Sequence, residues 1–138
     1  MTPQILNYIQ ITPHLSSAGK PTYAQLERLG EEGFEVVINL AVAHTTLKYE
    51  DRVLARQKIS YFHLPVTWEA PEVAQLELFL EIMSVLYGKK RILVHCVMNY
   101  RASVFIYRFM RDVLKKDLSF TAPKTFVPDA NWSALIHG

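Results

Sequence analysis

The junction around the chain's single cysteine constrains the fold more than any other segment. Residues 92–95 are short, apolar and rich in branched side chains, which is typical of a strand buried inside a sheet. Cys96 follows at once, and after a short turn residues 102–114 are apolar on nearly every side. A helix of that composition is buried over most of its surface. The segment therefore predicts a strand, a tight turn and a buried helix in the middle of the fold.

Strand-like and helix-like patterns alternate along the rest of the chain. We expect strands at residues 34–40, 61–66 and 92–95, with an edge hairpin formed by residues 5–11 and 15–18. Helices are expected at residues 22–30, 46–57, 71–87 and 102–114, with a short helix after Asp129. This alternation predicts one α/β domain over residues 1–138, with a central, mostly parallel sheet of four to five strands and helices on both faces.

The first of these helices carries the clearest start signal in the sequence. Thr22 and Gln25 have the spacing of a capping box, and Gly30 or Gly33 is expected to end the helix. Helical spacing places Tyr23, Leu26 and Leu29 on one face, which we expect to pack against the core.

The composition excludes several classes of protein. One cysteine in 138 residues rules out an internal disulfide framework and a Cys-rich zinc module, and the histidines lack metal-ligand spacing. A formal net charge of +2 is too small to argue for nucleic acid, and no apolar run is long enough to span a membrane. With no export signal visible at the amino terminus, we expect a cytoplasmic protein.

The turn after Cys96 has the chemistry of an anion site. The first backbone N–H groups of a helix have no acceptor within the helix, and with the helix dipole they favour a negative charge. Thiols ionise more readily in such a field. Arg101 lies five positions after Cys96 and could grip two oxygens of a phosphate or sulfate with its planar donors. The sequence therefore predicts a nucleophile and an oxyanion clamp on one turn.

Residues 94–103 resemble the signature of the cysteine-dependent phosphatase superfamily, which is His-Cys, five residues, then Arg and Ser or Thr. More closely, the chain is similar to the bacterial phosphatase-like domains that also occur fused to β-lactamase-hydrolase-like proteins. Further fragments that carry this resemblance are residues 17–22, 33–40 and 64–68 with Pro71. The resemblance implies the fold of a small dual-specificity phosphatase and the hydrolysis of a phosphomonoester without a metal or organic cofactor.

Carried over by position, the resemblance makes Cys96 the nucleophile, Arg101 the clamp on the phosphate oxygens and Ser103 the hydroxyl that eases departure of the thiolate. Covalent catalysis of this kind divides one difficult displacement into two easier ones and needs preorganised oxyanion donors. The neighbouring residues are expected to bind substrate or to hold the turn in shape, and His95 in particular to orient the cysteine. These residues are His95, Val97, Met98, Asn99, Tyr100 and Ala102.

The chain departs from the superfamily signature at two places. Only four residues separate Cys96 from Arg101, so either the loop is one residue shorter or Arg has moved by one position along the helix. In either case Asn99 takes the usual glycine position, where a positive φ is needed and Asn is the best substitute. Thr67 occupies the place of the general acid and is too weak for that role, which leaves Glu69, or alternatively Glu72, to supply the proton.

Two other functions fit the same turn. The spacing between Cys96 and Arg101 also resembles rhodanese-type sulfurtransferases, although the upstream segments of that family are missing. A module that binds phosphate or phosphoprotein without hydrolysing it is the other alternative, because a missing general acid lowers the rate far more than the affinity. In every case but the sulfurtransferase we expect a phosphorylated partner, protein or small molecule, and neither nucleic acid nor membrane.

Overall fold

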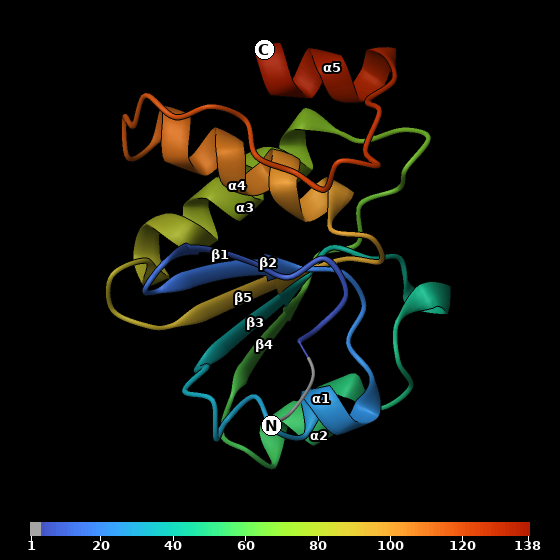
Figure 1. Cartoon of the computed structure of the whole chain (residues 1–138), viewed down its shortest axis with the longest axis vertical. Coiled ribbons are helices and arrows are strands. Elements are labelled where there is room, and N and C mark those ends of the chain that lie inside the picture. Colours follow the sequence, from blue (N-terminus) through green and yellow to red (C-terminus); the bar gives the residue numbers. More distant parts are fainter. Residues whose placement is uncertain (1–3) are drawn as a thin grey trace.

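A computed structural model describes residues 4–138 of the chain (Figure 1). Within these residues a five-stranded sheet is formed in the order β1-β2-β5-β3-β4. The strands are β1 (Ile9–Thr12), β2 (Leu15–Ala18), β3 (Val36–Asn39), β4 (Ser60–His63) and β5 (Ile92–His95). β1 runs antiparallel to β2 in the expected edge hairpin, and the other three pairings are parallel. The mostly parallel sheet predicted from the sequence is therefore confirmed.

Helices cover both faces of this sheet. Figure 1 shows α3 (Val73–Leu86), α4 (Tyr100–Asp112) and α5 (Ala130–His137) on one side, and α1 (Tyr23–Leu26) and α2 (Glu50–Ala55) on the other. A short 3₁₀ turn, Ala43–Thr45, precedes α2. In the part of the chain from residue 4 onward, none of the helices has the length and apolar character needed to cross a bilayer.

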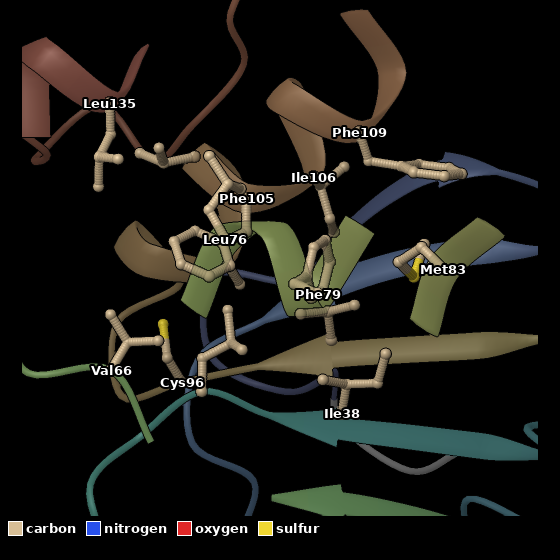
Figure 2. Close-up of a cluster of buried hydrophobic side chains, with 14 of the residues drawn as sticks. Ile38, Val66, Leu76, Phe79, Met83, Cys96, Phe105, Ile106, Phe109 and Leu135 are labelled. Carbon is tan, nitrogen blue, oxygen red and sulfur yellow. The ribbon is translucent and has the colours of Figure 1, made fainter. Parts of the chain in front are cut away.

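Each face of the sheet has its own hydrophobic core. The larger core joins the sheet to α3, α4 and α5, and Figure 2 shows Phe79, Phe105 and Phe109 within it. Phe79 and Phe105 meet edge to face with ring centroids 5.4 Å apart, an arrangement that adds to the energy of burial. The smaller core packs Leu26 and Leu54 of the opposite helices against the sheet. Helix α4 is thus fixed on the sheet directly after the cysteine turn.

Helices α1 and α2, which cover the face of the sheet with the smaller core, are shorter than expected. α1 begins with the predicted capping box but has only four residues, and turns then carry the chain to Gly33, whose φ is +93°. The prediction that Tyr23 packs in the core is wrong, because its ring is 44% exposed and its hydroxyl donates to the carbonyl of Lys48. α2 starts at Glu50 because Tyr49, at φ 65°, has a left-handed conformation that a continuous α-helix does not accommodate.

A charged cluster fastens α5 to the end of α4. Arg108 donates to the carbonyl of Leu135 and to Asp112, while Arg111 donates to the carbonyl of Ile136 and also to Asp112. Partial burial alone would raise the pKa of Asp112, but the hydrogen bonds from Arg111 and Arg108 outweigh it and hold this pKa below its ordinary value. The carboxylate of Asp112 therefore supports both arginines that hold α5.

Candidate active site

The cysteine turn lies at the carboxyl end of β5, between two neighbouring parallel strands. β5 ends at His95, and α4 begins at Tyr100, so the turn consists of residues 96–99. Asn99 has φ 67° and ψ 19°, the left-handed conformation expected from its place in the usual glycine position. The backbone N–H of Cys96 donates to the carbonyl of Ala18 at the end of β2. The first N–H groups of α4 have no acceptor within the helix, so they can bind an anion beside the turn.

Cys96 opens onto a cavity of about 360 Å³, and Arg101 lines the same cavity. The full lining consists of Trp68, Cys96, Val97, Met98, Tyr100 and Arg101. Cys96 is only 1% exposed, and Figure 2 shows its sulfur at one end of the hydrophobic cluster that also contains Val66. This cavity therefore gives access to Cys96, and Arg101 forms part of its wall.

Arg101 is a buried cation without a carboxylate partner. The residue is 8% exposed, and its Nη1 donates to the carbonyl of Val66 at 2.8 Å. Over residues 4–138, the other guanidinium donors make no hydrogen bond and no Asp or Glu forms an ion pair with Arg101. Burying an uncompensated charge is costly, and a charged group in such a place normally has a counterion. The free donors of Arg101 are therefore available to an anion in the cavity.

The turn is held from behind by residues that the sequence analysis did not single out. Asn99 uses its Nδ2 to donate to the carbonyl of Asn7 and to the hydroxyl of Ser17. Asn7 in turn donates through its own Nδ2 to the carbonyl of Met98. These bonds join positions more than 80 residues apart, so no local pattern in a single sequence could have revealed them.

Gly19 allows the chain after β2 to pass directly beneath the turn. A Cβ atom at this position would lie 2.5 Å from the carbonyl oxygen of Val97, closer than real contacts allow. The same oxygen accepts a hydrogen bond from the backbone N–H of Lys20. Gly19 and Lys20 belong to the fragment that carries the family resemblance, and the structure now gives that fragment a physical reason: it supports the back of the turn.

His95 does not reach the cavity but forms a buried pair with Glu50. The Nε2 atom of His95 lies 2.9 Å from Oε2 of Glu50, and each side chain is 1% exposed. On its other side the ring presents Nδ1 to the carbonyl oxygen of Cys96 at 3.3 Å. Burial, together with the charge of Glu50, raises the pKa of the nearby Tyr61 well above its usual value. The sequence analysis expected His95 to orient the turn but missed Glu50, which lies 45 residues away.

The loop expected to carry a general acid brings an aromatic ring to the cavity. Trp68 lines the cavity, whereas the hydroxyl of Thr67 donates to the carbonyl of Ala70 within the loop. Glu69 and Glu72 are exposed and do not line the cavity. None of the described residues that surround the cavity is a carboxylic acid. A proton donor for the leaving group is thus not preassembled next to Cys96.

Ser103 and Ala102 lie on the far side of the turn. The hydroxyl of Ser103 donates to Oδ1 of Asn99 at 3.2 Å, and Ser103 lines a different cavity of about 260 Å³ between β1 and α4. Ala102 is fully buried in the large core. Of the ten predicted site residues, the structure brings five into one cavity, and these are Cys96, Val97, Met98, Tyr100 and Arg101. The others lie behind the turn, apart from Glu69 on the surface.

Two aromatic rings form the walls beside the cysteine. Trp68 and Tyr100 have ring centroids 6.0 Å apart, and each ring is stacked on a further aromatic residue. Trp68 stacks on Trp132 at 5.1 Å, and Tyr100 stacks on Phe126 at 4.7 Å. The hydroxyl of Tyr100 is also hydrogen-bonded to that of Thr125. The walls are therefore rigid and mostly apolar.

Comparison with known proteins gives matches among solved structures. No family model matches the chain, and no curated protein matches it. A protein from Shewanella putrefaciens CN-32, described as a "putative phosphatase (DUF442)", is 31% identical over 96% of this chain and 90% of its own, with a TM-score of 0.85. Tk-PTP in its active form is 17% identical over 95% of this chain and 94% of its own, with a TM-score of 0.79.

A third solved structure is the core catalytic domain of the PP-IP phosphatase SIW14 from S. cerevisiae, in complex with citrate. It is 14% identical and covers 99% of this chain and 87% of its own, with a TM-score of 0.75. At these identities Tk-PTP and SIW14 establish the shared fold.

A mostly parallel sheet with a cysteine turn leading into a buried helix defines the fold of the cysteine-dependent tyrosine and dual-specificity phosphatases. The chain has this fold and belongs to the DUF442 phosphatase-like family. The resemblance inferred from residues 94–103 and the other matching fragments is thereby confirmed.

Proposed function

We propose that this protein is a cysteine-dependent phosphatase that hydrolyses a phosphomonoester through a phosphocysteine on Cys96. One observation carries the proposal: Arg101 is buried, has no carboxylate partner in residues 4–138, and lines the same cavity as the cysteine. A tetrahedral phosphate would supply the missing negative charge. Its oxygens would also accept hydrogen bonds from the first N–H groups of α4.

In the proposed reaction the thiolate of Cys96 attacks phosphorus, a sulfur–phosphorus bond forms and the bond from phosphorus to the ester oxygen breaks. Arg101 and the backbone N–H groups of the turn stabilise the charge on the equatorial oxygens. The leaving oxygen takes up a proton, and water then cleaves the phosphocysteine to release phosphate and the thiolate. This chemistry needs Cys96 as a free thiol, which agrees with a reducing compartment such as the cytoplasm.

The lining of the cavity supports a preference for esters with good leaving groups. Because no carboxylic acid surrounds the cavity in the described residues, the leaving oxygen has no strong proton donor beside it. The rings of Trp68 and Tyr100 offer apolar walls to an aromatic leaving group such as a phenol. We therefore propose an aryl phosphate as the kind of phosphorylated substrate that turns over fastest. Donation of the proton by Glu69, or alternatively by Glu72, stays a prediction from the sequence of this loop.

The same lining favours a second candidate function, the binding of a phosphorylated partner without hydrolysis. Oxyanion donors contribute to affinity whether or not a proton donor is present, while loss of the acid affects the chemical step. The discriminating feature is therefore turnover, because both functions require the anion to bind between Cys96 and Arg101.

Hydrolysis of para-nitrophenyl phosphate by the wild type and by Cys96→Ser tests the proposal. We expect turnover by the wild type and none by Cys96→Ser, while both proteins bind tungstate. Tungstate binding without turnover by the wild type would favour the binding module. Equal turnover by both proteins would remove the nucleophile assignment. Cyanide-dependent transfer of sulfur from thiosulfate would support the sulfurtransferase alternative instead.

A further inference from the structure

Glu50 is the only side chain in residues 4–138 with a fully enclosed polar atom that lacks a hydrogen-bond partner, because the unbonded donors of Arg101 are not fully enclosed. Its Oε2 accepts from His95, but its Oε1 has no partner although the side chain is 1% exposed. A buried oxygen without a partner costs about 1–3 kcal/mol, and more when it is charged. An apolar residue would avoid this cost. The presence of a carboxyl group here therefore points to a role beyond packing.

The geometry of His95 shows where that charge acts. The Nε2 atom faces a carboxylate oxygen of Glu50 at 2.9 Å, and Nδ1 faces the carbonyl oxygen of Cys96 at 3.3 Å. With Glu50 ionised, both oxygens are acceptors, and a ring that bonds to both of them then carries a hydrogen on each nitrogen. A neutral ring would direct a lone pair at one of the two oxygens. The arrangement thus fits an imidazolium between the two oxygens.

The other polar groups around this pair leave the carboxylate as the sole anion in contact with the ring. The hydroxyl of Tyr61 accepts a hydrogen bond from Asn39 and interacts with the carboxylate of Glu50, although it forms no direct hydrogen bond to Oε1. Asp51, the next acidic residue along α2, is exposed and lines an open cavity of about 670 Å³ together with Glu50 and Tyr61. Burial, and then the charge of Glu50, raises the pKa of Tyr61, so this hydroxyl adds no second anion beside the ring.

We propose that Glu50 is a positioning residue that holds His95 as an imidazolium, which fixes the backbone of Cys96 through its carbonyl oxygen and places a positive charge next to that carbonyl. This role rests on the proposed function of Cys96 as a nucleophile. It extends the site to the opposite face of the sheet, because α2 packs on the side away from α3 and α4 (Figure 1). A cation close to a cysteine favours the thiolate, the form that attacks.

The protonation state of His95 can be measured in the wild-type protein without any variant. Nuclear magnetic resonance of the ¹⁵N-labelled protein near neutral pH is expected to give two protonated ring nitrogens for His95, assigned with His95→Gln. In Glu50→Gln, which keeps an acceptor but removes the charge, we expect one protonated nitrogen. The matched control, Asp51→Asn, removes a neighbouring charge that does not touch the ring and should leave both. A neutral His95 ring in the wild type would overturn the proposal.

Alkylation of Cys96 by iodoacetamide tests the effect on the nucleophile. We expect Glu50→Gln to react about tenfold more slowly than the wild type near neutral pH, and Asp51→Asn to react within about twofold of it. Equal rates for Glu50→Gln and the wild type would contradict the positioning role. Neither measurement requires hydrolysis of a phosphate ester. The role of Glu50 can therefore fail while the phosphatase activity stands, and the reverse also holds.

Discussion

Asn99 and Ser103 lie one helical turn apart, and the hydroxyl of Ser103 donates to Oδ1 of Asn99 at 3.2 Å. The Nδ2 group of Asn99 is at the same time bonded to Asn7 and Ser17. Every polar atom of the Asn99 side chain is thus occupied behind the turn. Ser103 thus supports the turn through Asn99 and does not line the cavity, and its role in departure of the thiolate stays a prediction.

Two substitutions at Asn99 separate its backbone role from its side-chain role. Asn99→Gly keeps the left-handed conformation but loses the bonds to Asn7 and Ser17, at an expected cost of about 1–2 kcal/mol in unfolding free energy. Asn99→Ala also strains the backbone and should cost about 1 kcal/mol more. Chemical denaturation of both variants measures the difference. Equal stability of the two variants would show that the positive φ at residue 99 is not maintained.

Replacement of Gly19 tests whether the close packing of residue 19 against the carbonyl of Val97 holds the cysteine turn in place. In Gly19→Ala the new Cβ would meet the carbonyl of Val97 at 2.5 Å, so the turn must move. We expect tungstate affinity to fall by at least about tenfold, since preorganised donors lose strength when displaced. Gly88→Ala is the control: φ there is +83° with no atom within 4 Å of the added Cβ, so stability should fall while affinity stays. Unchanged affinity in Gly19→Ala would refute this support.

Leaving-group dependence tests the absence of an acid from the cavity. Without a proton donor, the rate should drop steeply from para-nitrophenyl phosphate to phenyl phosphate, whose phenolate is the poorer leaving group. Glu69→Gln should change both rates by less than about threefold, a loss well below that of a working general acid. Steady-state kinetics with the two esters is the measurement. A large loss in Glu69→Gln confined to phenyl phosphate would instead establish Glu69 as the acid.

The pH dependence of stability tests the charged cluster in which Asp112 bonds to Arg108 and Arg111. The pKa of Asp112 is lower in the folded protein than in the unfolded chain, where it is about 3.9. Asp112 therefore stabilises the folded state at pH values above the unfolded pKa, and this stabilisation is lost as the pH falls through the folded pKa. Asp112→Asn should therefore unfold about 1 kcal/mol more easily than the wild type at neutral pH. The difference should shrink below about pH 4. Chemical denaturation at both pH values is the measurement, and Asp117→Asn, at an exposed position, is the control. A difference in unfolding free energy between the wild type and Asp112→Asn that is the same at both pH values would contradict the role of the charged cluster.

The central strands of the sheet could be predicted from the sequence because each is identified by its own residues alone. Residues 36–39 and 92–95 are entirely buried, so continuous apolar runs identify them without knowledge of their neighbours. Tyr23 was placed wrongly because helical spacing does not show that the first residue of a helix can turn away from the core toward a neighbouring loop, whereas Leu26 and Leu29 of the same face are buried. α1 ends after four residues, and the ring of Tyr23 bonds to a loop 25 residues away.

The site could be predicted only in part for a related reason. Cys96 and Arg101 lie on one turn, so their spacing and the following helix predicted that they would share a cavity. Glu50, Asn7 and Gly19 come from other elements, and only the folded sheet brings them to the back of that turn. The opposite holds for Glu69, which is close in sequence to the lining residue Trp68 but is exposed to solvent.

Calorimetric titration with tungstate of the wild type, Arg101→Lys and Arg101→Met tests the central claim most directly, that Arg101 and the turn hold a tetrahedral oxoanion against Cys96. The account predicts binding by the wild type and loss of at least about a hundredfold in affinity in Arg101→Met, with Arg101→Lys intermediate because it keeps the charge but not the planar donors. Tungstate binding of equal strength in all three folded proteins would contradict it.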